Sequence, residues 1–165
     1  MNTLVVYDSA YGNTEKVARA IAEAFAPPHA VTVLRAGETN ATALESIDLL
    51  IVGSPTQGGR PTPAIQEFVN QIPSGALADV NVAAFDTRIS AQERGIGLRI
   101  LMRLLGFAAG RIANSLQAKG GRLAAPPEGF IVEDKEGPLR EGELERAAGW
   151  AVNTMAQPQH EQVMH

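Results

Sequence analysis

The chain has 165 residues, enough for one domain with a sizeable core, and 45% of them are hydrophobic while 19% are charged. It contains no cysteine, which excludes disulfide frameworks, thiol nucleophiles, cysteine–zinc sites and cysteine-ligated iron–sulfur clusters. The three histidines are His29, beside a Pro-Pro pair, and His160 and His165 near the C-terminal end. These are poor positions for a histidine-based triad or metal site, so we do not expect side chains to carry chemistry.

The net charge of −4 hides a basic stretch from Arg88 to Arg122, with seven basic residues against one acid, Glu93. We expect no nucleic-acid binding, because the chain is acidic overall and this stretch lacks interleaved aromatic residues. The sequence enters a strand-like run almost at once, with no basic and apolar leader before it, so a cytoplasmic location is the expectation.

Strands and helices alternate along the chain. Consecutive apolar residues predict strands covered on both faces at residues 3–7, 31–34, 49–52 and 80–85, and a fifth strand split by Pro126-Pro127 into 123–125 and 130–132. Helical periodicity predicts helices at residues 14–25, 63–72, 110–119 and 141–155, and a short helix or turn at 42–47. Residues 157–165 are polar and aperiodic.

This alternation predicts an α/β fold, a three-layer, doubly wound, five-stranded parallel sheet with helices on both faces. We expect one domain over residues 1–156, followed by a disordered tail over residues 157–165. In such a sheet, ligands bind beyond the carboxyl ends of the strands, where the strand order reverses.

The loop after the first strand has the parts of a phosphate cradle. It offers successive backbone amides, the hydroxyl groups of Ser9 and Thr14, the small Gly12, and the positive end of a helix. The alternative is structural: Ser9 or Asn13 caps the helix and Gly12 makes the turn.

Two other phosphate motifs are excluded. The segment 53–58, GSPTQG, has no lysine after it, so it is not a nucleoside-triphosphate loop, and Gly95-Ile96-Gly97 lacks the third glycine of a dinucleotide fingerprint. A monophosphate is therefore the better hypothesis. The Pro- and Gly-rich loop 53–61 can lay backbone against a flat ligand; it can also be a plain turn, although such turns commonly have only 2–6 residues.

The sequence resembles the flavodoxin family in four stretches: VVYDSAYGNTEKVA, IVGSPTQGGRPTPAIQEFV, VAAFDTR and GGRLAAPPEGFIVEDKEGPLREGELERAAGWA. The last is similar to the end of many small bacterial flavodoxin-like proteins, and the first loop resembles the flavodoxin domain of flavodiiron proteins. The resemblance implies the flavodoxin-like strand order 2-1-3-4-5 and the cofactor FMN. It implies no catalytic side chain and no metal.

The resemblance also implies which residues hold FMN. Carried over by position, the cofactor-binding residues are Ser9, Ala10, Gly12, Asn13 and Thr14 at the phosphate, Pro55, Thr56, Gln57, Gly58 and Gly59 along the isoalloxazine, and Thr87 and Arg88 opening the loop on its other side. Tyr11 either covers part of the ring or replaces a hydroxyl residue in the cradle.

The function that the resemblance implies is electron transfer with a redox partner protein. Two alternatives remain: a small FMN-dependent NAD(P)H:quinone-type reductase, and a flavodoxin-fold binding module that has lost FMN. Family members commonly stack aromatic side chains on the flavin, but neither the second nor the third loop holds Trp or Tyr. We expect the only Trp, Trp150, to pack elsewhere.

Charge also departs from the family pattern. Arg60 and Arg88 stand where typical flavodoxins are rich in acids, and a nearby cation favours an anion. We therefore expect the fully reduced flavin to be more stable than in a conventional flavodoxin.

The segment 94–107, RGIGLRILMRLLGF, is too apolar for one side of a surface helix and carries Arg94, Arg99 and Arg103 at helical spacing. It either packs within the subunit, forms a homodimer or partner surface, or lies on a membrane. Membrane contact is the interpretation that we favour least.

Overall fold

The computed structural model describes residues 1–90 and 106–156. The strands are β1 (Asn2–Tyr7), β2 (Ala30–Arg35), β3 (Leu49–Pro55), β4 (Asn81–Ile89), β5 (Arg122–Leu123) and β6 (Glu128–Val132). The helices are α1 (Asn13–Glu23), α2 (Pro63–Gln71), α4 (Ala108–Ala118) and α5 (Glu143–Ala156), with short 3₁₀ helices η1 (Ala36–Glu38) and η2 (Ala41–Leu44). The predicted tail, and all of the segment 94–107 except Gly106 and Phe107, lie outside the described residues, so those expectations stay predictions.

The strands form one parallel sheet in the order β2-β1-β3-β4-β5, which confirms the predicted fold class. The fifth position is occupied by two short strands. β5 pairs with the beginning of β4 and β6 pairs with its end, so that the sheet has six strands rather than five. Pro126 and Pro127 lie between them and cannot donate backbone hydrogen bonds, which explains the interruption.

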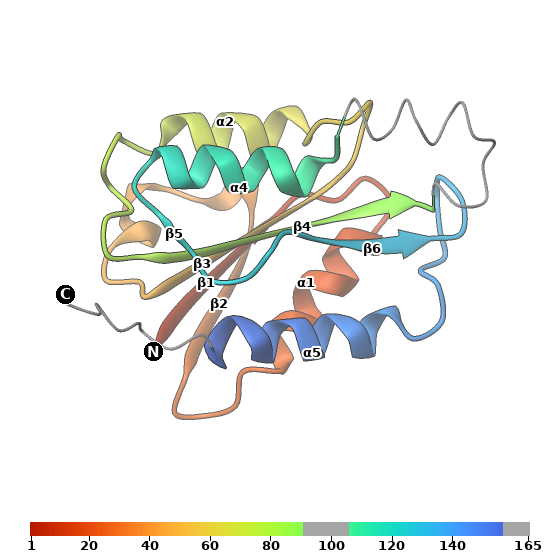
Figure 1. Cartoon of the computed structure of the whole chain (residues 1–165), viewed down its shortest axis with the longest axis horizontal. Helices are drawn as coiled ribbons and strands as arrows, with labels where there is room; N and C mark the ends of the chain where they lie inside the picture. The colour runs from red at the N-terminus through yellow and green to blue at the C-terminus, as the bar shows by residue number, and fades with distance from the viewer. Residues whose placement is uncertain (91–105, 157–165) are drawn as a thin grey trace, which may run out of the picture.

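Helices cover both faces of the sheet (Figure 1). Alternate side chains of the central strands point to opposite faces: Val5, Ile51 and Phe85 pack with α1 and α5, whereas Leu4 and Leu50 pack with α2 and α4. Both sets are buried, which is why the strands are apolar at consecutive positions. Among the described residues, no helix is long and apolar enough to cross a membrane.

Three aromatic rings meet between the sheet and α5. Phe85, Phe130 and Trp150 lie edge to face, with ring centroids 6.1–6.2 Å apart, and the Trp150 indole donates a hydrogen bond to the Pro126 carbonyl at 3.3 Å. The expectation that Trp150 packs away from the flavin loops is thus confirmed.

β3 and β4 extend further than their apolar runs predict. Asp86, Thr87 and Arg88 were expected in the loop after the fourth strand, but they lie within β4. Asp86 and Thr87 pair with Ser54 and Pro55 of β3, while the far side of β4 is paired with β6. Backbone pairing on both sides therefore continues the strand through polar residues that a hydrophobic pattern cannot assign.

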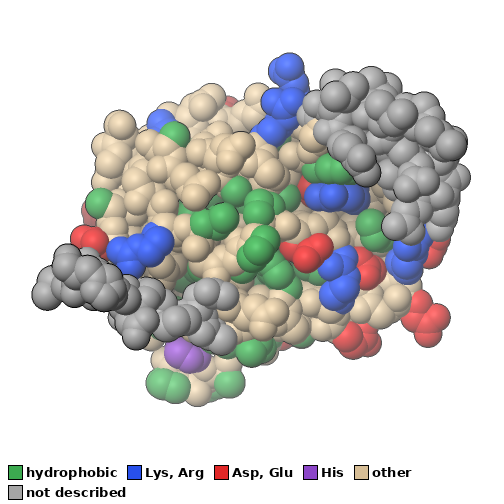
Figure 2. Space-filling view, viewed as in Figure 1, with side chains coloured by type: hydrophobic (Ala, Val, Ile, Leu, Met, Phe, Trp, Pro, Cys, Tyr) green, Lys and Arg blue, Asp and Glu red, His purple; other side chains and the backbone are tan. Residues whose placement is uncertain are grey.

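Glu143 ties the start of α5 to the last strand. Its carboxylate is buried, accepts the Ile131 amide at 2.7 Å and pairs with Arg146 at 2.7 Å. The Arg146 guanidinium is the main reason why the pKa of Glu143 is lowered, and the Ile131 hydrogen bond adds to it, against the opposing effect of burial. Acidic and basic side chains intermingle over this part of the surface (Figure 2).

We predict that Glu143→Gln lowers the free energy of unfolding by about 1.5–3 kcal/mol at pH 7, because charged hydrogen bonds are lost. A carboxylate with a lowered pKa in the folded state stabilises above its unfolded pKa, and this stability disappears as the pH falls through the folded value. The loss in Glu143→Gln should thus shrink between pH 7 and pH 3. Urea unfolding measures this, with the exposed neighbour Glu145→Gln as control; an equal loss at both pH values contradicts it.

Candidate functional site

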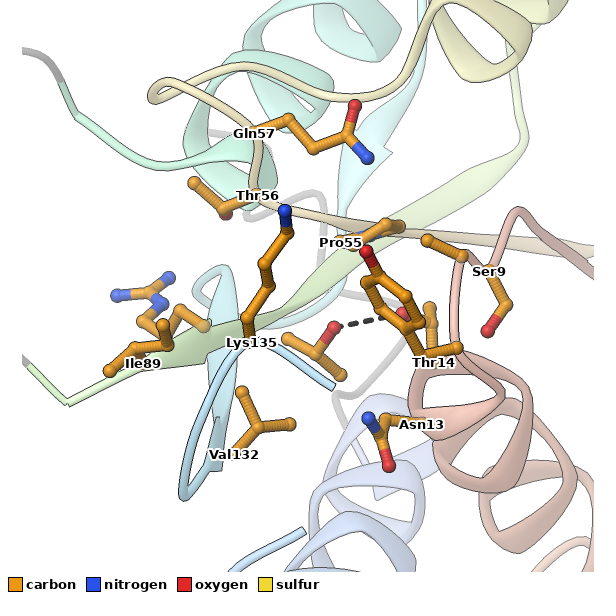
Figure 3. A pocket seen from close by; sticks show the side chains of 13 residues that line it. Ser9, Asn13, Thr14, Pro55, Thr56, Gln57, Ile89, Val132 and Lys135 are labelled. Carbon is orange, nitrogen blue, oxygen red and sulfur yellow. Dashed lines mark hydrogen bonds between the residues drawn. The ribbon is translucent and has the colours of Figure 1, made fainter. Parts of the chain in front are cut away.

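A cavity of about 430 Å³ opens at the carboxyl ends of β1, β3, β4 and β6 (Figure 3). Its volume is within the ordinary range of small-molecule sites. It is lined by Ser9, Ala10, Tyr11, Asn13, Thr14, Pro55, Thr56, Gln57, Thr87, Arg88, Ile89, Val132 and Lys135. The cavity therefore brings together all the predicted cofactor-binding residues except Gly12, Gly58 and Gly59.

Gly58 and Gly59 form a tight turn. Both have positive φ (58° and 79°), and Gln57 and Arg60 exchange two backbone hydrogen bonds of 2.8 and 3.0 Å around them. Two successive residues with positive φ make a hairpin turn that glycine adopts without strain. The turn by itself accounts for these glycines, and their predicted contact with a ligand stays a prediction.

The loop before α1 has the geometry of an anion cradle. Gly12 has φ 90° and donates its amide to the Ser9 hydroxyl at 2.9 Å, so the chain turns sharply into the helix. Gly12 is the N-cap of α1 and makes the turn, as the structural alternative predicted, and Asn13 does not cap the helix. Ser9 accepts the N-cap amide, but no described side chain accepts the amides of the first helical turn. Within residues 1–90 and 106–156, the amides of Ala10 and Asn13 donate to no acceptor, and uncapped amides at a helix N-terminus bind anions.

Arg35, at the end of β2, holds this loop from outside. Its guanidinium contacts the Asp8 carboxylate at 3.4 Å, the Ser9 carbonyl at 3.2 Å and the Glu15 carboxylate at 3.3 Å, and it lies over the Tyr7 ring. Arg35 was not predicted from the sequence. Its role follows only from the parallel pairing of β1 with β2, which places their ends side by side.

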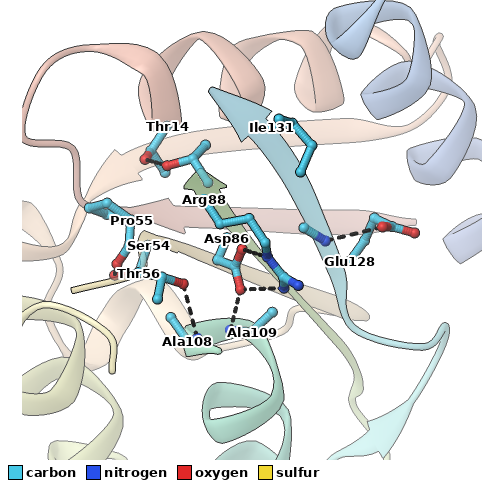
Figure 4. A network of polar contacts seen from close by, with 12 residues as sticks. Thr14, Ser54, Pro55, Thr56, Asp86, Arg88, Ala108, Ala109, Glu128 and Ile131 are labelled. Carbon is cyan, nitrogen blue, oxygen red and sulfur yellow. Dashed lines mark hydrogen bonds and ion pairs between the residues drawn. The ribbon is translucent and has the colours of Figure 1, made fainter. Parts of the chain in front are cut away.

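Asp86, which is buried, and Arg88, which is half-buried at the cavity wall, form an ion pair (Figure 4). The Asp86 carboxylate is fully buried, accepts two hydrogen bonds of 2.7 Å from Arg88 and one of 2.9 Å from the Ala109 amide at the start of α4. The guanidinium carbon lies 3.6 Å from the centroid of the Phe107 ring. A Cβ at Gly129 would lie 2.1 Å from the Arg88 Nε, so the adjacent strand needs glycine there.

The sequence led us to expect that Arg60 and Arg88 place positive charge beside the ligand, and the structure corrects this expectation. Arg88 was treated as a free cation beside the ligand, but Asp86 neutralises it, Phe107 stacks on it and Gly129 lies close against it. Arg60 lines a separate, smaller cavity between α2 and α4. Neither arginine places an unpaired positive charge in the main cavity.

Threonine hydroxyls join the walls of the cavity. Thr56 accepts the Ala108 amide at 3.1 Å and so links the loop after β3 to α4. Thr14 and Thr87 share a buried hydrogen bond of 2.8 Å between the first loop and β4 (Figure 4). These bonds fix the relative positions of the three chain segments that surround a ligand.

Three lining residues were missed by the sequence analysis: Ile89, Val132 and Lys135. Ile89 is the last residue of β4 and Val132 is the last residue of β6. Ligands bind at the carboxyl ends of parallel strands, so correct strand limits would have been enough to predict both residues. Lys135 lies in the loop after β6, which reaches the cavity because the Asn13 side chain donates a hydrogen bond to the carbonyl of the next residue, Glu136. Local sequence carries no signal for such a contact.

The family model that describes the flavodoxin domain matches residues 4–119, which is well over half of the chain. The chain belongs to the flavodoxin family. No curated protein sequence matches it.

Two solved flavodoxins are similar to this chain over nearly their whole length, and one larger protein is similar over about a third of its length. Oxidised flavodoxin 2 from Bacillus cereus is 22% identical with a TM-score of 0.70, covering 94% of this chain and 98% of that one. A flavodoxin from the Archaea is 21% identical with a TM-score of 0.69, covering 97% and 100%. Rubredoxin oxygen:oxidoreductase from Desulfovibrio gigas is 20% identical with a TM-score of 0.67, covering 93% of this chain but 35% of that chain. At these identities the likeness shows the fold.

We predict that Arg88→Gln lowers the free energy of unfolding by about 3 kcal/mol, because it leaves the buried Asp86 carboxylate without its partner. Asp86→Asn should cost less, because the Arg88 side chain is 22% exposed at the cavity and can be solvated. The double variant should lose less than the sum, since the two residues act on each other. Urea unfolding measures both, and Asp79→Asn, which breaks an exposed pair with Arg122 at 3.9 Å, should change stability by less than about 0.5 kcal/mol. If the loss of stability in the double variant equals the sum of the losses in the two single variants, the predicted interaction between Asp86 and Arg88 is contradicted.

Proposed function

We propose that this chain binds FMN and carries electrons between redox partner proteins. The observation that carries the proposal is the uncapped N-terminus of α1, at the edge of a cavity between the carboxyl ends of β1, β3 and β4. The strand order reverses there, since β1 is followed by β2 on one side and β3 on the other. This is where a doubly wound sheet binds a phosphate-bearing ligand.

The residues present fit FMN in kind. The unpaired amides of Ala10 and Asn13 suit a phosphate dianion, because they combine free donors with the positive end of a helix. Pro55 to Gln57 form one wall for a flat ring, and Ile89 and Val132 offer apolar contacts on another (Figure 3). When bound, FMN supplies one- and two-electron chemistry, which is consistent with a chain that has no cysteine.

Binding of FMN and of riboflavin tests the proposal. We predict that the purified protein binds FMN at least about tenfold more tightly than riboflavin, which lacks the phosphate and its charged hydrogen bonds to the loop. Fluorescence quenching of the two flavins measures both dissociation constants. No affinity for FMN would contradict the proposal and leave a binding module without flavin.

A second assay separates a carrier from an enzyme. The FMN-loaded protein is mixed with NADH or NADPH and a quinone, without any partner protein. A carrier gives no multiple-turnover oxidation of the nicotinamide, whereas steady turnover would favour the small quinone reductase instead.

Tyr11 provides a further prediction. It lines the cavity, is 48% exposed, and its hydroxyl makes no hydrogen bond within the described part of the chain. If the ring covers the flavin, Tyr11→Phe keeps the affinity for FMN and Tyr11→Ala weakens it by about twofold to tenfold, as expected for an aromatic pair. If the hydroxyl serves the phosphate, Tyr11→Phe and Tyr11→Ala weaken FMN binding equally. We expect the first result, because the exposed ring lines the cavity and would bury apolar surface against a flat ligand.

A further inference from the structure

Lys135 reaches across the cavity from the loop between β6 and α5. It lines the cavity, and its side chain extends toward Thr56 and Gln57, away from the end of the cavity formed by Ser9 and Thr14 (Figure 3). Within residues 1–90 and 106–156, its ammonium group makes no hydrogen bond or ion pair. It is therefore a solvated cation directed at the region where a ring, rather than a phosphate, would lie.

The other charges around the cavity do not cancel this cation. Arg88, the other charged lining residue among those described, is neutralised by Asp86. The acids beside Lys135 in sequence are exposed and do not line the cavity: Glu133, which pairs with Arg140 at 3.6 Å, Asp134 and Glu136. Lys135 is exposed too, but of these four residues it alone lines the cavity, so it lies nearest to a ligand bound there and has the larger Coulomb effect on its charge.

The loop that carries Lys135 is docked on the anion cradle. Glu133 donates its amide to the Pro138 carbonyl at 2.8 Å, which closes the loop at its base. Asn13 donates its side-chain amide to the Glu136 carbonyl at 3.1 Å. Gly137 has φ 108°, and a Cβ there would lie 2.8 Å from the Asn13 amide nitrogen, so only glycine allows this approach. The backbone next to Lys135 is consequently held against the loop that would bind the phosphate.

We propose that Lys135 is the residue that sets the redox preference of this site, by placing its ammonium group beside the isoalloxazine and stabilising the negative charge of the reduced ring. The inference rests on the proposed function, because it needs FMN in the cavity. Full reduction adds two electrons from the reductant, a partner protein or dithionite, and one proton from water, and so leaves one negative charge on the ring. The ammonium group of Lys135 lowers the energy of this charge by Coulomb attraction.

The test compares Lys135→Gln and Lys135→Glu with Lys119→Gln. Lys119 follows α4 and accepts the Leu77 amide with its backbone carbonyl, near the amino ends of β4 and β5 and so at the end of the sheet away from the cavity. Its replacement changes the net charge equally without changing the cavity. The readouts are the two-electron midpoint potential at pH 8, by dye-coupled titration with dithionite, and the dissociation constants of oxidised FMN and riboflavin. Far-ultraviolet circular dichroism checks that each variant is folded.

We expect Lys135→Gln to lower the ratio of affinities for reduced over oxidised FMN by about tenfold, which is a fall of about 30 mV in the two-electron potential. Lys135→Glu should lower the two-electron potential further, and Lys119→Gln should leave it unchanged. The difference in potential between wild type and Lys135→Gln should shrink in 1 M salt, because salt screens the charge. The affinity for oxidised FMN should change by less than about twofold.

The negative outcomes are distinguishable. If wild-type protein binds no FMN, the proposed function itself fails and this inference with it. If FMN binds and Lys135→Gln has the wild-type potential, the inference alone is overturned. If Lys135→Gln weakens oxidised FMN but leaves riboflavin unchanged, Lys135 serves the phosphate, and the inference is again overturned.

Discussion

The pairing of the second half of β4 with β3 on one side and β6 on the other is the constraint on which the site depends. β3 and β6 hold the last residues of β4 in extended conformation, although these residues are polar. This pairing directs Asp86 into the protein, where it meets Arg88 and the first amides of α4. A shorter β4 would leave that carboxylate in solvent and would release both α4 and the loop after β3, which α4 holds through Thr56.

The polar groups of the site divide into those that build it and those left for a ligand. Asp86, Arg88, Thr14, Thr56 and Thr87 satisfy one another or the start of α4, so they fix the shape of the cavity. Free amides of the first loop and the Lys135 ammonium remain. A cavity whose wall side chains mostly satisfy one another, and which presents donors and positive charge, is suited to an anionic ligand that carries the chemistry itself. This agrees with a sequence that has no cysteine and only three histidines.

Much of the fold and of the candidate site could be predicted from the sequence, and the residues that were misjudged or missed have a common cause. The apolar runs of β1 and β3 and the helical period of α1 are local patterns, and they predicted a parallel, doubly wound sheet. The cavity contains most of the residues carried over from the flavodoxin resemblance, because glycines, hydroxyls and strand ends are visible in sequence. Arg88 was misjudged since its partner, only two residues away, was assigned to a loop, where the two side chains need not meet. Arg35 and Lys135 were missed because each contacts the first loop from a remote segment.

The sequence by itself determined the layers of the fold, the family, and the cradle around Gly12, since hydrophobic period, turn residues and helix starts are properties of neighbouring residues. The tertiary structure alone decided which charges are free. Arg88 and Lys135 are equivalent cations in the sequence, yet one lies against a buried carboxylate and a phenyl ring and the other extends into the cavity. The difference has a physical reason: the effect of a charge depends on the groups around it, and here those groups come from strands and loops that only folding brings together.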